Sequence, residues 1–354
     1  MHMERTAILL LFGGESSEHD VSISSVRNVY AAIDNNKFVV HLAYIDRQGK
    51  WWLIDRLTQE IDTHGAPQLV PVMGSGSFVT MPSGRVIKPD VILPILHGKN
   101  GEDGSVQGLA QLQHVPIVGC DMTASAICMD KLATKEILMT AGINIAPYEV
   151  HRKGAPIPDF NHLSMRLGVP MFVKPSRAGS SVGVSKVHSE EELSRALEEA
   201  HRHDETVLIE RGISGRELEV SVLGNPPHHQ VSGVGEVKPG DDFYSYDDKY
   251  AANSASQVII PADLTEAQLG RIRDAAAKTY EILGCKGLSR VDFFLADDDT
   301  LYVNEINTLP GFTNISMYPK LWRQEGISYS ELIERLIKLA TEDGQPETIE
   351  DEEE

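Results

Sequence analysis

The sequence lacks the features that mark secreted, membrane-bound or nucleic-acid-binding proteins. It has three cysteines in 354 residues and no C-x-x-C pair, which favours buried reduced thiols over disulfides or a zinc site. No apolar run approaches the roughly 18 residues that a membrane-spanning helix needs, and the early run Ile8–Phe12 is too short for a secretion signal. A formal net charge of −20 disfavours nucleic acid and anionic lipid as partners. We therefore expect a cytoplasmic protein that binds neither nucleic acid nor a membrane.

Strand and helix patterns alternate along the first third of the chain. Thr6–Phe12, Phe38–Ile45 and Val91–Leu96 are predicted strands, and such alternation predicts a parallel sheet covered by helices. Ligands bind at the carboxyl ends of the strands of such a sheet. The loops Gly13–Glu18 and His97–Gly104 follow two of these ends, so we expect them to contribute to a site.

Two helices are predicted to begin at a capping box. Ser17 is followed three residues later by Asp20, and Thr265 is followed by Gln268. In this pattern each side chain bonds to the backbone N–H of the other residue. The sequence therefore predicts helix starts at Ser17 and at Thr265.

The strongest chemical signal is a predicted antiparallel hairpin over residues 290–307, whose connection is short and rich in Asp. Side chains alternate between the two faces of a strand, so Arg290 and Asp292 share one face of the first strand. On the second strand, Glu305 and Asn307 likewise share a face. Four polar side chains are thus expected on one surface of the hairpin.

The register of this hairpin predicts a metal site. If Ala296 pairs with Leu301, then Asp292 lies directly opposite Glu305, about 5 Å away, where like charges repel. A cation removes that repulsion, and two carboxylates with the amide of Asn307 suit Mg²⁺ or Mn²⁺. The alternative is a set of polar residues that face solvent.

A second signal is a loop of small residues that follows Lys174. The segment 175–183 is rich in serine and glycine and ends at a predicted strand, and such a loop can fold over phosphates. It also contains a Gly-x-Ser-x-Gly pattern around Ser181, which in serine hydrolases requires a strand–turn–helix context. Phosphate binding, a structural loop and a hydrolase nucleophile all stay open from these residues alone.

A third, weaker signal is the end of the predicted strand Thr206–Arg211. The chain turns there, and Glu217 lies a few residues beyond. Free backbone groups at such a turn can bind the edge of an adenine, and a carboxylate can bind ribose hydroxyls. Most strand ends bind nothing, so the pattern only suggests a nucleotide site.

Taken together, seven motifs in this order resemble the D-alanine–D-alanine ligase family, a branch of the ATP-grasp superfamily. The similarity runs from about residue 6 to about residue 340. The motifs are Gly13-Gly14-x-Ser16-x-Glu18-x-x-Val21-Ser22, His97-Gly98-x-x-Gly101-Glu102-Asp103-Gly104, Met129-Asp130-Lys131, Lys174-Pro175 with Gly179-Ser180-Ser181-Val182-Gly183, Tyr244-x-Tyr246-x-x-Lys249-Tyr250, Arg290-Val291-Asp292, and Asn304-Glu305-Ile306-Asn307-Thr308-Leu309-Pro310-Gly311.

The resemblance implies an α/β, three-domain ATP-grasp fold with ATP between the central and C-terminal domains. We expect an N-terminal substrate domain over residues 1–122, a central subdomain over 123–210 and a C-terminal catalytic subdomain over 211–343. The acidic tail, 344–354, is expected to be disordered. A homodimer is also implied by the resemblance.

The resemblance also implies a role for each residue of the site. ATP would be bound by Lys131, Lys174, Ser180, Ser181, Glu210, Arg211, Ile213, Glu217 and Lys249. Two Mg²⁺ or Mn²⁺ would be bound by Asp292, Glu305 and Asn307. The two D-alanines and the oxyanion would be held by Glu18, His97, Arg290, the Gly311 N–H and Ser316. Tyr250 would bond to Ser180 and close a lid.

The implied reaction joins two D-alanines through a D-alanyl phosphate, for peptidoglycan precursor synthesis. The rival hypotheses are a related ligase whose second substrate is D-serine or D-lactate, a serine hydrolase using Ser181, and a nucleotide-binding regulator without catalysis. Relatives that use D-lactate lack the tyrosine found here as Tyr250, which favours D-alanine as the second substrate.

Overall fold

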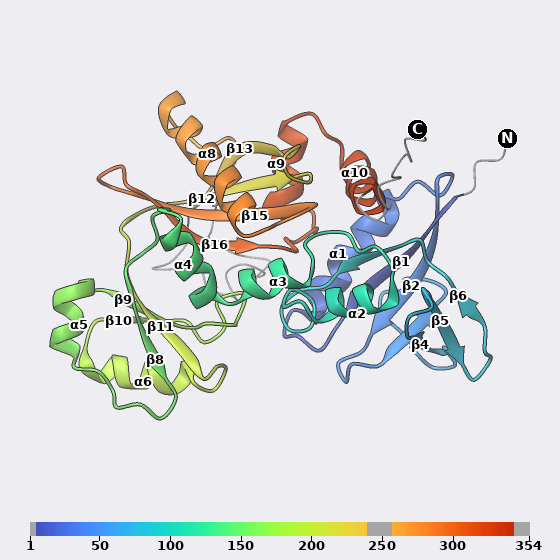
Figure 1. The fold of residues 1–354 in the computed structure, drawn as a ribbon, viewed down its shortest axis with the longest axis horizontal. Coiled ribbons are helices and arrows are strands. Elements are labelled where there is room, and N and C mark those ends of the chain that lie inside the picture. The colour runs from blue at the N-terminus through green and yellow to red at the C-terminus, as the bar shows by residue number, and fades with distance from the viewer. Residues whose placement is uncertain (1–4, 239–256, 343–354) are drawn as a thin grey trace, which may run out of the picture.

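The computed structural model has three lobes, each built on its own β-sheet (Figure 1). The structure describes residues 5–238 and 257–342. The sheets contain seven, four and five strands and are drawn from residues 6–95, 148–211 and 215–307 respectively. The division into three domains stays a proposal, and the expected tail falls outside the described residues.

The first sheet is mixed, with strand order β6-β5-β4-β3-β2-β1-β7. Its strands are β1 (Thr6–Gly13), β2 (Phe38–Ile45), β3 (Trp51–Ile54), β4 (Gln68–Val72), β5 (Ser77–Met81), β6 (Val86–Ile87) and β7 (Val91–Ile95). β1 pairs in parallel with β2 and β7, as the sequence predicted. The antiparallel extension by β3 to β6 was not predicted.

Helices cover both faces of this sheet, because β1 is apolar at every position from Ile8 to Phe12. Even-numbered residues of β1 pack against α1 (His19–Ala32) and α10 (Tyr329–Glu342), while the odd-numbered ones pack against α2 (Ser105–Gln113). In Figure 1, α10, near the end of the chain, lies beside α1, near its beginning. The first lobe therefore draws part of its core from the last helix.

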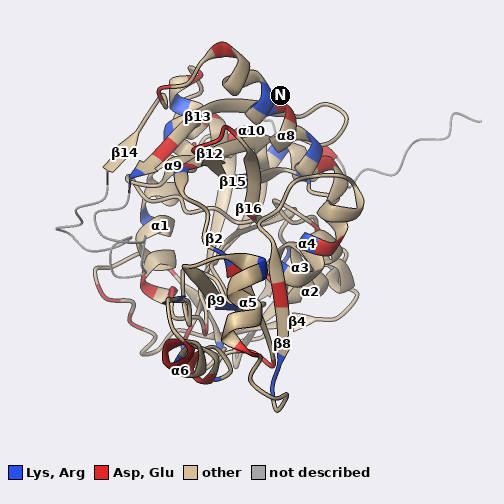
Figure 2. Cartoon of the chain, turned by 90° about the vertical axis from the view of Figure 1, so that its left-hand side faces the viewer, with Lys and Arg blue, Asp and Glu red and all other residues tan. Residues whose placement is uncertain are grey.

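The second sheet is antiparallel, with order β10-β9-β11-β8. Its strands are β8 (Tyr148–Arg152), β9 (Met171–Pro175), β10 (Ser185–Val187) and β11 (Thr206–Arg211). The helices α5 (Phe160–Leu167) and α6 (Glu190–Ala200) pack on one face of this sheet. Acidic residues gather on α6 (Figure 2). Two helices, α3 (Met122–Met129) and α4 (Lys131–Thr140), lead from the first lobe into this one.

The third sheet is also antiparallel, with order β14-β13-β12-β15-β16. Its strands are β12 (Gly215–Leu223), β13 (Gln230–Lys238), β14 (Gln257–Ile259), β15 (Leu288–Ala296) and β16 (Leu301–Asn307). Val291, Phe293 and Leu295 pack with α8 (Glu266–Ile282) in one core, so the predicted alternation is confirmed. The other face of β15 carries the polar side chains, and α9 (Met317–Gln324) packs nearby against β12 and β13.

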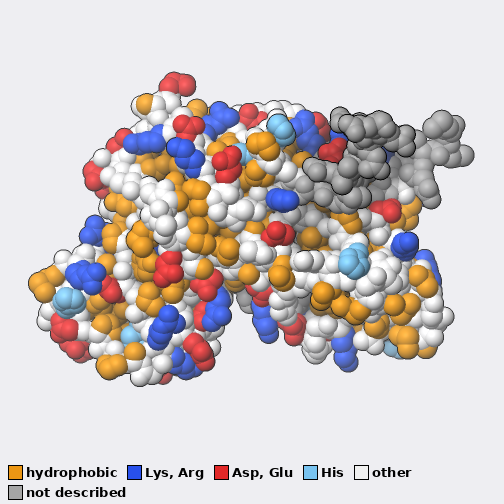
Figure 3. Space-filling view, viewed as in Figure 1, with side chains coloured by type: hydrophobic (Ala, Val, Ile, Leu, Met, Phe, Trp, Pro, Cys, Tyr) orange, Lys and Arg blue, Asp and Glu red, His pale blue; other side chains and the backbone are white. Residues whose placement is uncertain are grey.

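The visible surface shows charged side chains of both signs between scattered apolar ones (Figure 3). No helix within residues 5–238 and 257–342 is both long and apolar enough to cross a membrane.

Candidate active site

Eight of the predicted site residues line one cleft where the three lobes meet. The cleft holds about 120 Å³. These eight residues are Glu18, His97, Ser180, Arg290, Glu305, Asn307, Gly311 and Ser316. An adjoining cavity of about 50 Å³ shares Glu18, Ser180, Glu305 and Asn307 with the cleft and adds Lys131. Residues that lie hundreds of positions apart in the sequence are therefore brought into one continuous space.

The hairpin of β15 and β16 places Asp292 directly opposite Glu305, as predicted. The route to this pairing differs from the prediction, because Leu301 pairs with Leu295 and not with Ala296. A β-bulge at Asn304 adds one residue to β16 and restores the pairing of the carboxylates. The turn therefore has a different register, while the site keeps the expected one.

Arg290 holds the polar face of the hairpin together. Its Nε and Nη2 atoms each donate to a carboxylate oxygen of Asp292 at 2.7 Å, and Nε lies 3.1 Å from Glu219. Burial alone lowers the pKa of Arg290, but the charges on Asp292 and Glu219 raise it well above its usual value. Glu219 was missed by the sequence reasoning. The sequence pattern that could have identified it is its position two residues after Glu217 on a predicted strand, which puts both on one face. The structure places it opposite Asp292.

Lys131 joins the hairpin to the phosphate loop. It is the first residue of α4, and its Nζ lies 3.6 Å from Glu305 and donates to the carbonyl of Ala178 at 2.7 Å. Asp130 caps α4 and also accepts the Ser176 hydroxyl at 2.6 Å. The start of α4 and the loop are therefore fixed to each other on the same side of the cleft.

The loop over residues 176–184 turns sharply at its centre. Ser180 and Ser181 have φ angles of 49° and 59°, a backbone conformation that residues other than glycine rarely adopt. The Ser180 hydroxyl donates to the Glu18 carboxylate, across 162 positions of sequence. The loop continues into β10, which pairs antiparallel with β9. Since no helix follows Ser181 there, the nucleophile-elbow context that a serine hydrolase needs is missing.

Lys174 and Glu210 lie behind this loop, on neighbouring strands. Lys174 Nζ is 2.8 Å from Glu210 Oε2, and Lys135 Nζ is 3.1 Å from Glu210 Oε1. All three side chains are buried. The carboxylate of Glu210 is therefore occupied by two lysines. Lys135 was not predicted, although its place four residues after Lys131 on a predicted helix puts the two lysines on one face.

The other predicted adenosine residues lie at the turn between β11 and β12. Ile213 is half-buried in this turn, and Glu217 lies on β12 just beyond it. The Arg211 guanidinium donates to the carbonyls of Arg166 and Leu167 at the end of α5. The side chain of Arg211 is therefore bonded to the helix, which leaves backbone groups at this turn as the available contacts.

The first lobe contributes a buried pair of carboxyl groups, Glu18 and Glu102. Glu102 accepts the Gly98 N–H at 2.8 Å. Burial, helped by the charge on Glu18, raises the pKa of Glu102 to about 8. Glu102 lies within the His97–Gly104 motif, but no role was predicted for it. Burial also lowers the pKa of His97, against the opposing charge of Glu18.

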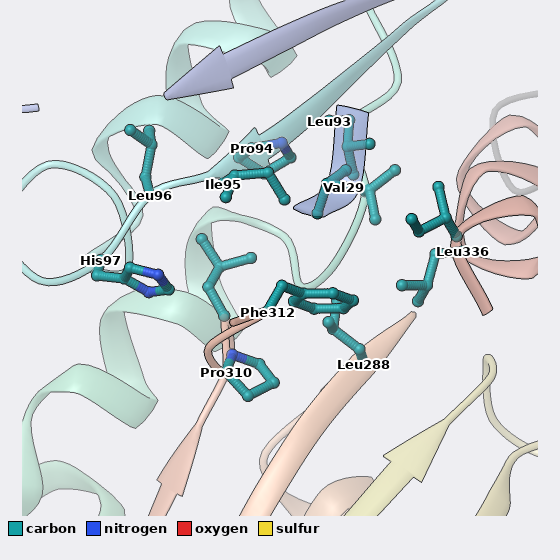
Figure 4. Close-up of a pocket in the computed structure, with 13 residues that line it drawn as sticks. Val29, Leu93, Pro94, Ile95, Leu96, His97, Leu288, Pro310, Phe312 and Leu336 are labelled. Carbon is teal, nitrogen blue, oxygen red and sulfur yellow. The ribbon is translucent and has the colours of Figure 1, made fainter. Parts of the chain in front are cut away.

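His97 also marks the border between the cleft and the apolar seam of the first and third lobes. It lies at one end of a pocket and Leu336 at the other, with Phe312 between them (Figure 4). The pocket holds about 10 Å³, which is roughly the room of one water. We therefore regard it as a packed seam that fixes the His97 backbone, and not as a second ligand site.

Gly311 and Ser316 close the far side of the cleft. A side chain at Gly311 would place its Cβ 2.8 Å from the Ser316 hydroxyl, so only glycine fits without a shift. Ser316 precedes α9 and accepts the Thr313 N–H at 3.0 Å. A helix start beside a hydroxyl is well suited to bind a carboxylate.

Two predicted residues, Lys249 and Tyr250, lie outside the described residues. Within the described ranges, no group of three or more His, Cys, Asp or Glu side chains is arranged as a metal site. The predicted metal donors are two carboxylates and one amide, so phosphate oxygens would have to complete the shell.

Comparison with known proteins identifies the family. Residues 7–120 match the family described as D-ala D-ala ligase N-terminus, and residues 137–338 match D-ala D-ala ligase C-terminus. The chain is 44% identical to D-alanine–D-alanine ligase A of Chromobacterium violaceum, with 97% of both chains covered. It is equally similar, at 44%, to D-alanine–D-alanine ligase A of Escherichia coli, with 96% and 97% covered.

Solved structures agree with this match. The D-alanine–D-alanine ligase of Coxiella burnetii superimposes with a TM-score of 0.87 at 32% identity, covering 97% of this chain and 96% of that one. The VanG D-Ala:D-Ser ligase of Enterococcus faecalis gives 0.86 at 35% identity, covering 95% and 100%. The predicted α/β fold is thus confirmed, and the chain belongs to the D-alanine–D-alanine ligase family.

Proposed function

We propose that the chain joins two D-alanines at the expense of ATP, through a D-alanyl phosphate. The observation that carries this proposal is the meeting of Arg290, Glu305 and the Ser180–Glu18 pair in one cleft, with Asp292 paired opposite Glu305. A carboxylate is a poor electrophile. Transfer of the γ-phosphoryl group to the first D-alanine gives an acyl phosphate, and attack by the amine of the second releases phosphate.

Asp292, Glu305 and Asn307 fit a site for two Mg²⁺ or Mn²⁺. Their oxygens are hard donors on one face of the hairpin, and the like charges of Asp292 and Glu305 face each other there. When bound, the metals would supply positive charge to the transferring phosphoryl group. Lys131 and Lys174 would add charge from the protein, with the loop of Ser180 and Ser181 over the phosphates.

The adenosine would lie at the turn after β11. Because the Glu210 carboxylate is bound to two lysines and the Arg211 guanidinium to α5, we assign the adenine contacts to the backbone of residues 210–213. Ile213 would pack on the base. Glu217, on the adjoining strand, would bind the ribose hydroxyls.

The amino-acid substrates would lie on the opposite side of the cleft. Glu18 would bind the ammonium of the first D-alanine, with His97 beside it, and Ser316 would bind the carboxylate of the second. Arg290 and the Gly311 N–H would stabilise the oxyanion of the tetrahedral intermediate. Lys249 as an ATP contact and Tyr250 as a partner of Ser180 remain part of the proposal, as do a homodimer and a cytoplasmic location.

The choice of second substrate gives a direct test of the proposal. With D-alanine, D-serine and D-lactate in competition from pH 6 to 9, we expect D-alanyl-D-alanine as the main product at pH 7 to 8. The ammonium of the second D-alanine must lose a proton before it attacks. The share of D-alanyl-D-alanine among the products should therefore fall towards pH 6, where D-lactate competes best. The measurement is product composition by mass spectrometry, with phosphate release as the rate.

Two comparisons make this test decisive. Tyr250→Phe, which removes only the hydroxyl proposed to bond Ser180, should raise the share of D-alanyl-D-lactate at low pH. If the unaltered chain makes mainly the depsipeptide or D-alanyl-D-serine across the whole range, the substrate assignment is wrong, although the nucleotide chemistry would stand.

The phosphate loop should respond to nucleotide. Bound phosphate gives the loop's N–H groups fixed acceptors, so a non-hydrolysable ATP analogue with Mg²⁺ should slow amide exchange over residues 178–183 by about tenfold or more. Hydrogen-exchange mass spectrometry measures this, with β8 of the same lobe as the internal control. Equal exchange with and without the analogue would contradict the proposed loop, and labelling of Ser181 by a fluorophosphonate would favour the hydrolase.

A further inference from the structure

A third lysine, Lys135, lies buried behind the two lysines proposed to contact phosphate. It is one turn after Lys131 on α4 and is 1% exposed. Lysine is almost never buried to this extent unless it is paired. Its Nζ lies 3.1 Å from Glu210 and 5.8 Å from the centre of the Tyr148 ring. Lys135 was assigned no role in the reaction described above, and its burial calls for a physical reason.

The reason lies in how the charge on Glu210 is shared. One oxygen of this carboxylate is 3.1 Å from Lys135, and the other is 2.8 Å from Lys174. The group therefore holds two positive charges and one negative charge. Without Lys135, the carboxylate would cancel the charge of Lys174, and the phosphates would meet a neutral pair. With Lys135 in place, one positive charge is left over on the side of Lys174.

The charge states of these groups support this count. Burial alone raises the pKa of Glu210, but Lys135 and Lys174 together lower it, so the carboxylate is ionised. Burial lowers the pKa of Lys135, Glu210 opposes that change, and the nearby charges on Lys174 and Lys131 add to it. The negative charge of Glu210 is thus favoured by both lysines, whereas the positive charge of Lys135 is favoured by Glu210 and disfavoured by burial and by the other two lysines.

We propose that Lys135 is a positioning residue, which neutralises Glu210 and so leaves the charge of Lys174 available to the nucleotide phosphates. The inference rests on the proposed contact between Lys174 and phosphate. Lys135 acts indirectly, since Glu210 lies between it and Lys174. It should therefore affect the binding of phosphate and have little effect on the binding of adenosine.

The test is calorimetric binding of ADP and of adenosine to the full chain and its variants. Lys135→Met keeps the length of the side chain and removes its charge, and it should weaken ADP binding by about tenfold while adenosine binding stays unchanged. In turnover, the KM for ATP should rise by a similar factor, with a smaller change in kcat. The double variant K135M/E210Q restores the net charge and should bring ADP affinity back to within about threefold of the parent.

Three outcomes would overturn the inference. They are equal weakening of ADP and adenosine in K135M, no recovery in the double variant, and tenfold weaker ADP binding in E210Q alone. The E210Q result does not depend on whether K135M folds, because E210Q retains both lysines and should bind ADP at least as tightly as the parent. Lys174→Met separates this inference from the proposed function. If K174M binds ADP normally, the phosphate contact itself is wrong.

Discussion

Replacing Glu305 by Gln is expected to lower kcat by about 10³-fold or more without unfolding the protein. Glu305 is one of the two opposed carboxylates of the hairpin and lies 3.6 Å from Lys131. Gln keeps the size of the side chain but removes the charge that a divalent cation needs. It also removes the partly exposed ion pair with Lys131, while the repulsion with Asp292 is already offset by Arg290, so the thermal midpoint should change little. Phosphate release against Mg²⁺ concentration and a thermal melt measure the two effects.

Asp299→Asn provides the matched control for this variant. Asp299 lies in the turn of the same hairpin, is exposed, and has a φ of 67°, which Asn tolerates well. This variant makes the same carboxylate-to-amide change away from the cleft, so its kcat should stay within about twofold of the parent. Near-normal turnover of E305Q at ordinary Mg²⁺ concentrations would rule out the proposed metal site.

The second large effect is expected at Arg290. We expect Arg290→Lys to lower kcat by about 10²- to 10³-fold, although it preserves the charge. The guanidinium bonds both oxygens of Asp292 and lies 3.1 Å from Glu219 at the same time, which a single ammonium group cannot reproduce. The oxyanion would lose a fixed donor, and Asp292 would lose its orientation. Single-turnover measurements, which separate nucleotide binding from chemistry, test this expectation.

A buried change of this kind can also lower stability, so the control must distinguish the two causes. Arg216→Lys breaks a similar bidentate contact, with Glu236, on the same sheet but outside the cleft. It should lower stability, though less than R290K because the Arg216 side chain is more exposed, and leave kcat nearly unchanged. If the loss of activity in R290K and R216K is proportional to the drop in their melting temperatures, the role proposed for Arg290 in the oxyanion site fails.

The sequence predicted the chemistry of the hairpin well because the relevant information is local. Alternation along two short strands is enough to put Asp292 and Glu305 on one face. The same holds for the capping box at Thr265, which the structure confirms. The prediction at Ser17 is wrong, because α1 begins at His19 with Glu18 at its N-cap position. The Ser16 hydroxyl accepts a hydrogen bond from the Glu18 N–H. Glu18 thus lies at the start of the helix, where its carboxylate accepts the Ser180 hydroxyl.

The residues that sequence reasoning missed share one property. Glu219, Glu102 and Lys135 matter through partners that are distant in sequence, and their types alone fit a solvated surface equally well. Burial and the distance to Glu210 or Arg290 are properties of the assembled lobes. The strands β3 to β6 were missed for a different reason, since each is only two to five residues long.

The packing of α10 on the first lobe has a consequence for synthesis on the ribosome. The Ser330 hydroxyl donates to the carbonyl of Ala32 across 298 positions, and Lys37 pairs with Glu334 at 2.8 Å. One face of the β1 sheet is thus covered in part by a helix that is translated about 298 residues after the segment it covers. At roughly 5 to 20 residues per second, that apolar face waits about 15 to 60 s for its cover. We therefore expect this part of the face to stay exposed until α10 has been made, and a chain truncated before Tyr329 to leave it uncovered.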